Sequence, residues 1–457
     1  MPAIDRVTTL TVAARRRIGA FDPFGLGVST TPAAGDAFSS ALLRLLQVES
    51  GAEGLLEEAI RLDPDFSLAH GVLATVLAER AGDPVRISAL LHRARETSHR
   101  AGDREASFVT CAVLWCADGL SGDASLVRHV RTWPRDAYAV SLLVPSISSG
   151  GVTDCVYRVW SLIDELAAGV GDAWWLSSLR AFGCAERRRW LEAEDLALGA
   201  LEAQPGAGHA AHALAHVLYE TGRHEGAVDW IDDWLAGPGR RQEFRGHFAW
   251  HAALVELVAG DHDAVERRFD RELAPLVGNR MLVDGGSIVA RAALHGHPLG
   301  PGRRRWVAAA AGEALRAPSS PFLAWNAAVF AAIGGDAPAV QAIEVQARTL
   351  AQRGRARAEA WSQVAVVCRA LREHGRGRLA FAADLLRSLG DTSPLGGSPA
   401  QRELLEDLAF RWLAEAGHRE SAALLAAERL ERRPSAFDAA LRDGRVGRPA
   451  ATLQAGR

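Results

Sequence analysis

The chain has 457 residues, of which 48% are hydrophobic and 23% charged, and its formal net charge is −3. This balance leaves no basic or acidic face large enough to favour nucleic acid or a membrane, so we expect neither as a partner. The sequence contains no lysine, which excludes a lysine-dependent phosphate loop and a lysine Schiff base.

The composition predicts an all-α fold. Alanine and leucine are abundant and tyrosine is rare, a bias that suits helices better than sheets. No stretch of eighteen apolar residues occurs, so we expect a soluble, cytoplasmic protein. The cysteines show no CxxC spacing and stand in apolar surroundings, which predicts buried, reduced thiols; they are Cys111, Cys116, Cys155, Cys184 and Cys368.

Residues 1–37 are predicted to form an irregular N-terminal segment that caps the fold or covers its groove. The segment contains Asp22-Pro23-Phe24-Gly25-Leu26-Gly27 and Ser29-Thr30-Thr31-Pro32, and glycines and prolines at this density are typical of turns. The two glycines lack the third glycine and the preceding strand of a dinucleotide-binding fingerprint. We therefore expect no Rossmann-type flavin or nicotinamide domain.

Residues 38–434 are predicted to form one continuous α-solenoid of tetratricopeptide-like helical hairpins. Two sets of residues share a spacing of seven and five positions: Ala52, Ala59 and Pro64, and Ala193, Ala200 and Pro205. Small packing residues followed by a closing proline are typical of the second helix of such a hairpin. Stacked hairpins make a solenoid with a concave inner face. Periodicity weakens over residues 435–457, where we expect a loosely ordered tail.

Two short motifs each place two imidazoles one helical turn apart. They are His212-Ala213-Leu214-Ala215-His216 and His247-Phe248-Ala249-Trp250-His251. Nine of the fifteen histidines fall between residues 209 and 297, so the enrichment needs a local reason. In a hairpin solenoid the two helices can face each other, with Asp284 at the start of the next helix. These four histidines and Asp284 are the candidate site.

The residues leave several kinds of chemistry open at this site. Imidazole nitrogens four residues apart on a helix point the same way and are good ligands for zinc, iron or copper. The sequence nevertheless has no HExxH motif and no accompanying glutamates of a di-iron carboxylate site. The alternatives are a metal site, metal-free acid–base chemistry, a pocket for a small molecule or peptide, and structural imidazoles bonded to backbone and carboxylates.

Three further side chains are expected to line the pocket: Trp250, Ser287 and Asn326. Ser287 and Ser398 are the only suggestive nucleophiles. Neither stands in a GxSxG turn between a strand and a helix, so each is interpreted as a helix cap or turn residue.

Several segments between Phe24 and Pro434 carry a resemblance to a known family. They are Gly-Leu-Gly-Val-Ser-Thr-Thr, Asp63-Pro64-Asp65-Phe66-Ser67-Leu68-Ala69-His70, Pro134-Arg135-Asp136-Ala137, His212 to Val217, His247 to Leu254, Leu282-Val283-Asp284 and Gly396-Gly397-Ser398-Pro399-Ala400-Gln401-Arg402. Through them the chain resembles the tetratricopeptide repeat protein 38 family, also called the StaR-like family.

The resemblance implies an all-α tetratricopeptide-like solenoid. Some bacterial members of the family are encoded beside antibiotic-biosynthesis genes, and a hydroxylating role has been speculated for them. The chain departs from the family at two positions that usually carry histidine, because Asn326 stands in one and Pro399 in the other. If those histidines belong to a shared site, this chain carries a reduced version of it.

Two functions from different classes are compatible with these observations. The first is a binding scaffold, in which a central histidine-lined groove holds a partner protein, a peptide or a small ligand, as such repeats commonly do. The second is an enzyme that acts on a small metabolite through the histidine cluster, with or without a metal, in a hydroxylase-like or hydrolytic reaction. The repeat pattern favours the first and the concentration of histidines the second, and the residues assign no cofactor.

Overall fold

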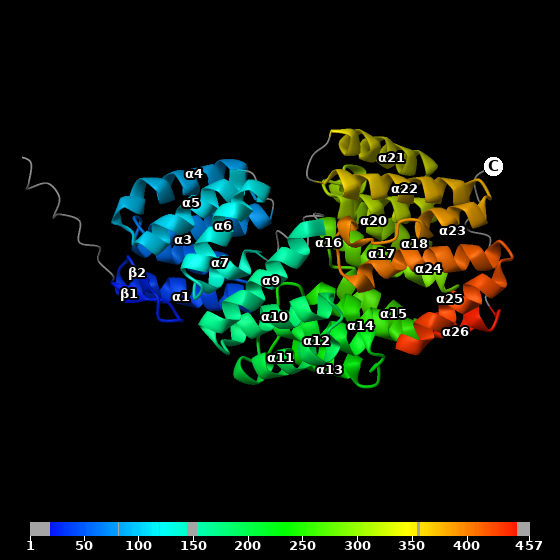
Figure 1. Ribbon diagram of the computed structural model, residues 1–457, viewed down its shortest axis with the longest axis horizontal. Helices are drawn as coiled ribbons and strands as arrows, with labels where there is room; N and C mark the ends of the chain where they lie inside the picture. Colours follow the sequence, from blue (N-terminus) through cyan, green and yellow to red (C-terminus); the bar gives the residue numbers. More distant parts are fainter. Residues whose placement is uncertain (1–18, 81, 118, 144–152, 354–356, 446–457) are drawn as a thin grey trace, which may run out of the picture.

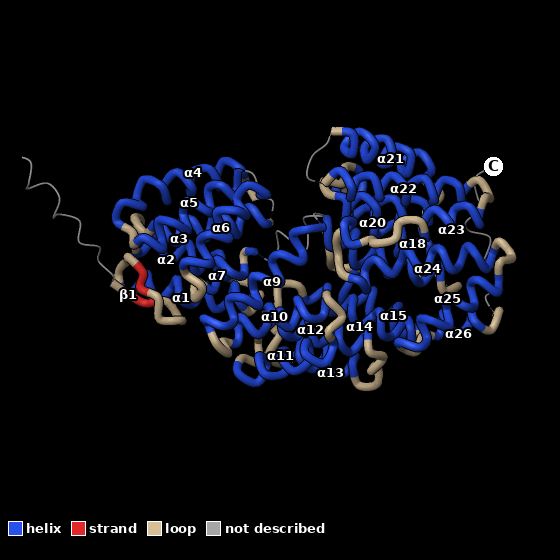
Figure 2. Tube along the Cα trace, viewed as in Figure 1, coloured by secondary structure: helices blue, strands red, loops and turns tan. Residues whose placement is uncertain are grey.

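A computed structural model describes residues 19–80, 82–117, 119–143, 153–353 and 357–445 of the chain. Most of these residues are helical, as Figures 1 and 2 show. The strands in the described part are β1 (Ala20–Phe21) and β2 (Gly27–Val28), which pair antiparallel. The all-α class predicted from the composition is confirmed.

The N-terminal third consists of helices that pack on their sequence neighbours. α1 packs on α2, α3 on α4 and α5 on α6, and α3 also packs on α5. The bounds of these helices are α1 (Pro32–Leu46), α2 (Ala52–Leu62), α3 (Ser67–Glu79), α4 (Pro84–Thr97), the 3₁₀ turn η1 (Ser98–Arg100), α5 (Asp103–Ala117), α6 (Gly119–Thr132), α7 (Ala137–Ser141) and α9 (Thr153–Val170).

The middle third continues this pairing and carries all of the candidate site. α10 packs on both α11 and α12, and α12 packs on α14. The bounds here are α10 (Trp174–Glu186), α11 (Trp190–Ala203), α12 (Gly208–Glu220), α13 (Ala227–Ala236), α14 (Arg245–Ala259), α15 (His262–Arg268), the π-helical turn η2 (Phe269–Leu273), α16 (Gly278–Arg280), the π-helical turn η3 (Met281–Gly285) and α17 (Gly286–Leu294).

The C-terminal third turns back on the middle of the molecule. α24 packs on α17 and α26 packs on α14, so the end of the described chain lies beside the site-bearing helices (Figure 1). The bounds are α18 (Gly300–Ala311), α19 (Glu313–Arg316), α20 (Pro321–Ile333), α21 (Ala337–Gln352), α22 (Ala358–Gly375), α23 (Leu379–Arg387), the 3₁₀ turn η4 (Ser393–Leu395), α24 (Pro399–Glu415), α25 (Arg419–Arg432) and α26 (Ala436–Arg442).

Two large hydrophobic cores meet between α12 and α14. The first includes Val28 near the N-terminus and extends to Ala213 and Leu214 of α12. The second includes Trp250 of α14 and extends to Leu441 of α26. A smaller cluster joins α12, α13 and α14. The two histidine-bearing helices therefore lie at the boundary between the cores.

The N-terminal segment is held by side-chain contacts over the described residues. Asp22 accepts hydrogen bonds from the backbone of the turn between β1 and β2. The backbone N–H of Ser29 donates to Glu105 at 2.9 Å, and the hydroxyl of Thr30 donates to Asp63 at 2.7 Å. Helix α1 begins at Pro32, with Thr31 as its N-cap, so helical structure starts inside the segment that was expected to be irregular up to residue 37. The cause is the Thr-Pro pair, which supplies a cap and a first-turn proline.

The C-terminal segment expected as a loose tail from residue 435 begins with packed structure. Ser435 caps α26, and Phe437, Asp438 and Leu441 of that helix are buried. Buried apolar and paired polar side chains hold this short helix against the rest of the protein. Residues 446–457 lie outside the described part of the chain.

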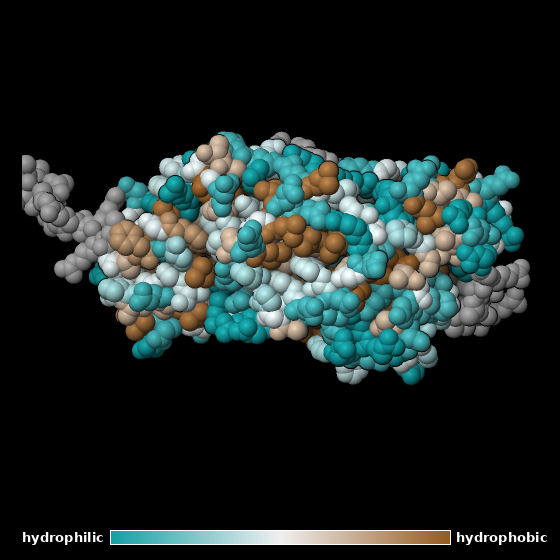
Figure 3. All heavy atoms as spheres, turned by 90° about the horizontal axis from the view of Figure 1, so that it is seen from below, coloured by the Kyte–Doolittle hydropathy of each residue, from teal (hydrophilic) through white to brown (hydrophobic). Residues whose placement is uncertain are grey.

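The molecular surface and the cysteine thiols can be compared with the expectations drawn from the sequence. The lower face of the molecule is largely hydrophilic, with apolar side chains gathered near its middle (Figure 3). None of the described helices is long and apolar enough to cross a membrane. Cys111, Cys116, Cys184 and Cys368 are unpaired thiols, and all of them except Cys116 are buried. The side chain of Cys155 lies outside the described part of the protein.

Candidate functional site

Helices α12 and α14 bring the two histidine pairs together. Both helices are rich in alanine, and Ala211, Ala215 and Ala252 pack in one small cluster between them. Small side chains let helix axes approach closely. The imidazoles at i and i+4 on each helix then point into the same space.

The Nε2 atom of His212 lies at the centre of the cluster. It is 3.1 Å from Nε2 of His247, 3.1 Å from Nε2 of His251 and 3.2 Å from Nε2 of His216. Ligand atoms of His212, His216 and His251 all lie within 4.8 Å of one another. The structure therefore brings together all four predicted histidines.

These three short contacts cannot all be hydrogen bonds. A neutral imidazole nitrogen carries either one proton or one lone pair, so Nε2 of His212 has at most one proton to share among three neighbouring nitrogens. The other contacts bring ring nitrogens together without a hydrogen bond between them. Such an arrangement is typical of ligands around a cation.

The spacing also agrees with metal coordination. In a tetrahedral site with metal–nitrogen distances of about 2.0–2.1 Å, neighbouring nitrogens are about 3.3–3.4 Å apart. The three distances from His212 are within a few tenths of an ångström of that value. The chemistry of the donor set suits zinc, copper, nickel or iron.

Burial keeps most of the cluster uncharged. His251 and His216 are almost completely buried and His247 is 8% exposed, whereas His212 is partly exposed. Loss of hydration lowers the pKa of His216 to about 3 and holds the pKa of His212 and His251 well below the ordinary value. At neutral pH these imidazoles are neutral, which is the form that binds metal ions.

Asp284 orients His247. Its Oδ1 lies 2.9 Å from Nδ1 of His247, and its Oδ2 lies 3.7 Å from the guanidinium of Arg280. The carboxylate therefore accepts a hydrogen bond from Nδ1–H, which leaves the lone pair of Nε2 directed at the cluster. A carboxylate behind a histidine is the usual second contact of a metal-binding imidazole.

Asp284 owes its position to the π-helical turn η3. α16, η3 and α17 form a continuous run of helical turns from Gly278 to Leu294, and residues 281–285 take the wider turn. Asp284 is completely buried there. It was expected at the start of a helix and lies instead within this turn, and such π-turns are frequent at functional sites.

Two aromatic rings pack against the cluster. The ring of Trp250 stacks on His247 at an interplanar angle of 7° and a centroid distance of 5.2 Å. The ring of Phe182 from α10 stacks on His212 at 5.1 Å. These contacts hold the imidazoles in place and exclude water from one side of each ring.

The other predicted residues are placed as follows. Ser287 accepts a hydrogen bond from Nε1–H of Trp250 at 3.4 Å. It belongs to α17 and is buried, so its interpretation as a cap or turn residue is wrong; the preceding π-turn continues directly into the helix, which needs no cap there. Asn326 donates to the carbonyl of Phe322 within α20, and Pro399 is the first residue of α24.

Ser398 is the N-cap of α24 and forms a capping box with Gln401, which confirms its interpretation as a cap. Phe182 and Arg280 were not predicted. Arg280 stands four residues before Asp284, and this helical spacing could have indicated the pair. Phe182 reaches the site from another hairpin, and no local pattern indicates that contact.

Fold and site together define an all-α protein with a cluster of four histidines, three of them buried, supported by an aspartate. The comparisons provide no family for it, since no protein-family model and no curated protein matches the chain.

Proposed function

We propose that the chain binds a divalent transition-metal ion, zinc in the first instance, through His212, His216 and His251, with the fourth coordination position left open and His247 beside it. The observation that carries this proposal is the convergence of His212, His216 and His251, whose ligand atoms all lie within 4.8 Å of one another. A cation would accept one lone pair from each of these nitrogens in their neutral, deprotonated-Nε2 form. Asp284 adds one negative charge behind the cluster, which offsets part of the charge of the ion.

The proposed activity is a metal-dependent reaction on a small metabolite. A zinc ion held by these three imidazoles would supply a Lewis acid at its open position, which could polarise a carbonyl or activate water. Asp284 keeps the proton on Nδ1 of His247, and Trp250 and Phe182 fix two of the rings. His212 is the partly exposed member, so the substrate approaches from its side.

A second candidate function is docking of a partner protein or peptide on a tetratricopeptide-like solenoid. The supporting observation is that alternate helices pack on one another, as in α3 with α5, α10 with α12 and α20 with α22. Stacked helical hairpins have this contact pattern. The resemblance to the StaR-like family supports a role beside specialised metabolism for either function.

Metal content tests the first proposal. We expect purified protein, reconstituted with zinc and freed of excess ion by dialysis, to retain one zinc ion per chain by elemental analysis. His212→Ala should retain less than a tenth of that amount. His70→Gln is the matched control, because His70 is also buried but bonds to the carbonyl of Pro64 at 3.0 Å, far along the chain from the cluster.

Each outcome of the zinc-content experiment either supports or overturns the proposed metal site. Full retention by His70→Gln with loss in His212→Ala supports the site, provided that circular dichroism shows both variants folded. If His212→Ala does not fold, His251→Gln replaces it as a variant that keeps more of the side-chain volume. A wild-type protein without stoichiometric zinc after reconstitution would overturn the metal centre.

A further inference from the structure

The C-terminal segment lies across the ends of α12 and α14, which carry the histidines, and of α17, which follows the turn that holds Asp284. A methyl group on Gly222, just after α12, would lie 2.6 Å from Cδ of Pro434. A methyl group on Gly260, just after α14, would lie 3.3 Å from Cβ of Ala436. His295, just after α17, stacks on Phe437 at 4.3 Å. One short stretch of chain therefore contacts the ends of α12, α14 and α17.

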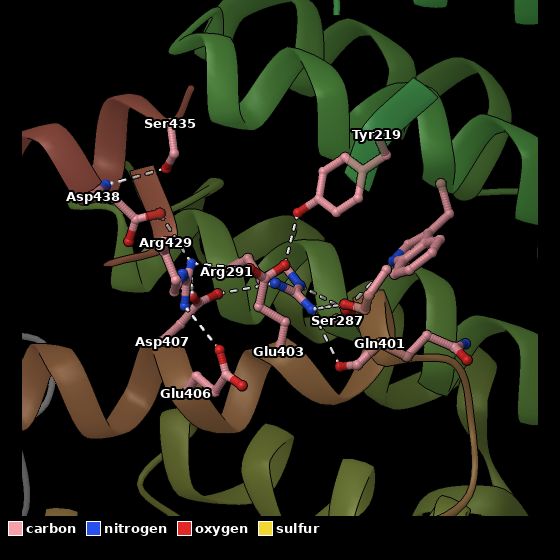
Figure 4. Close-up of polar contacts among 12 residues, drawn as sticks. Tyr219, Ser287, Arg291, Gln401, Glu403, Glu406, Asp407, Arg429, Ser435 and Asp438 are labelled. Carbon is pink, nitrogen blue, oxygen red and sulfur yellow. Dashed lines mark hydrogen bonds and ion pairs between the residues drawn. The ribbon is translucent and has the colours of Figure 1, made fainter. Parts of the chain in front are cut away.

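A buried network of charges fastens this segment (Figure 4). Arg429 lies 2.8 Å from Asp407, 3.1 Å from Glu403 and 3.2 Å from Asp438. Arg433 pairs with Glu403, which also accepts a hydrogen bond from Tyr219 of α12 at 2.9 Å. The network joins α12, α24, α25 and α26.

Arg291 connects this network to the histidines. Its guanidinium donates to Asp407 at 2.9 Å and to the backbone carbonyl of Ala400 at 2.6 Å. Its Nε–H donates to Oγ of Ser287 at 3.4 Å, and the same oxygen accepts from Trp250, whose ring stacks on His247. The ring of Trp250 also contacts that of the proposed ligand His251 at a centroid distance of 4.8 Å, so a chain of contacts leads from α24 to the metal site.

The charged side chains of this network depend on one another because all of them are buried. Its charged members are each less than 10% exposed, and they comprise three arginines and three carboxylates: Arg291, Arg429, Arg433, Glu403, Asp407 and Asp438. A buried charge without its partner is strongly destabilising. Undocking of α25 and α26 would remove Arg429, Arg433 and Asp438 together and leave the other three partly unpaired. The segment is therefore expected to dock as one unit.

We propose that α24–α26 act as a brace that positions the helices of the metal site, so that metal binding and docking of residues 429–442 stabilise each other. This inference rests on the metal centre proposed above. Two events that each favour the same arrangement of α12, α14 and α17 are coupled, and the coupling is reciprocal. Arg291 is the positioning residue in this arrangement, since it contacts both sides.

Hydrogen exchange and metal affinity test the brace in the full chain. We expect zinc to slow amide exchange in residues 429–442 at least tenfold in the wild-type protein. Arg291→Met should bind zinc 10–100-fold more weakly, the usual range for loss of a contact behind the ligands, and should alter the visible spectrum of bound Co²⁺. A merely structural role would leave that spectrum unchanged.

The matched control is Arg104→Met. Arg104 is also a well-buried arginine, paired with Asp136 at 2.7 Å in the N-terminal core. Its loss should reduce stability while zinc affinity and the Co²⁺ spectrum stay as in the wild type. Asp438→Asn provides a second variant of the brace if Arg291→Met fails to fold, because it keeps the shape of the side chain at the far end of the network.

These experiments distinguish a failure of the brace proposal from a failure of the metal-site proposal. If the wild-type protein binds zinc but residues 429–442 exchange at an unchanged rate, the brace is overturned and the metal centre stands. The same holds if the folded brace variant binds zinc with wild-type affinity and the wild-type Co²⁺ spectrum. A wild-type protein that binds no zinc overturns both.

Discussion

Burial shifts the pKa of individual side chains on α10 and α12 in the direction that favours their uncharged form. The imidazole of His216 on α12 loses hydration and has a pKa of about 3. Glu186, at the end of the neighbouring α10, responds in the opposite direction: burial raises its pKa to about 7, although the positive charge of Arg402 opposes the rise. In both residues the uncharged form is favoured, since removal from water penalises charge.

This shift of Glu186 predicts a pH dependence of stability. Its pKa is about 7 when folded, against 4.5 for a free glutamate, so the protonated side chain stabilises the fold below about pH 4.5 and this contribution is lost as the pH rises to 7. Glu186→Gln should therefore exceed the wild type in unfolding free energy by about 1–2 kcal/mol at pH 8, after allowance for its partial exposure. The gain should shrink at pH 5.

Urea unfolding at pH 5 and pH 8 measures this difference. Glu202→Gln is the control, because Glu202 is an exposed glutamate on α11. Equal gains of Glu186→Gln at the two pH values would contradict the raised pKa of Glu186.

At the scale of single residues, the sequence predicted the proximity of those site residues that lie on the same helix. The spacing of His212 and His216, and of His247 and His251, indicates their common direction. The sequence does not reveal that all four use Nε2, since this depends on how closely α12 and α14 approach. Phe182 was missed for the same reason.

At the scale of elements, the space around a glycine shows how closely its helix packs against a neighbouring helix. A Cβ atom added to Gly183 of α10 would lie 2.4 and 2.6 Å from ring atoms of Trp160, a buried side chain of α9. A Cβ atom added to Gly199 of α11 meets nothing within 4 Å. The same substitution thus meets a rigid neighbour at one position and open space at the other.

We predict opposite effects of alanine at these two glycines. Gly183→Ala should destabilise the protein by about 1–3 kcal/mol, because the clash with an indole ring outweighs the helix propensity of alanine. Gly199→Ala should stabilise it by about 0.5–1 kcal/mol. Urea unfolding of both variants measures the pair. A gain of stability in Gly183→Ala would contradict the contact between α9 and α10.

The start of a helix could be predicted from the sequence where residues next to each other in the chain determine it. Ser398 was correctly interpreted as a cap, because a serine before proline with glutamine three residues later satisfies the first helical turn by itself. The π-turn that holds Asp284 was not predicted. The local sequence only indicates a helix there, whereas the observed turn brings Gly285 so close to Met281 that an added Cβ atom would lie 2.7 Å from its sulfur.

At the scale of the whole molecule, the return of the C-terminal helices could not be predicted. Contacts such as Arg291 with Asp407 join residues 116 positions apart, and each partner alone has the pattern of an ordinary helix surface. The same limit applies to the two hydrophobic cores, whose boundary depends on which helices pack together. That boundary coincides with the histidine cluster.

The position of the cluster between the cores leads to a prediction for the whole protein. His212 and His216 stand on α12, which contributes Ala213 and Leu214 to the N-terminal core and Tyr219 to the C-terminal core, whereas His247 and His251 stand on α14 near Trp250 of the C-terminal core. A metal ion bound by both helices would strengthen the link between the cores. We therefore expect the chelated protein to melt in two calorimetric transitions and the zinc-loaded protein in one transition at higher temperature.

The size of this effect follows from mass action. Free zinc at 100 times its dissociation constant would stabilise the folded state by about 2.7 kcal/mol, and the melting temperature should rise further with zinc concentration. His251→Ala should show two transitions with or without zinc, because its ligand from α14 is lost. If chelated and zinc-loaded protein both melt in one transition at the same temperature, the two cores are already coupled by packing alone and the metal adds no link between them.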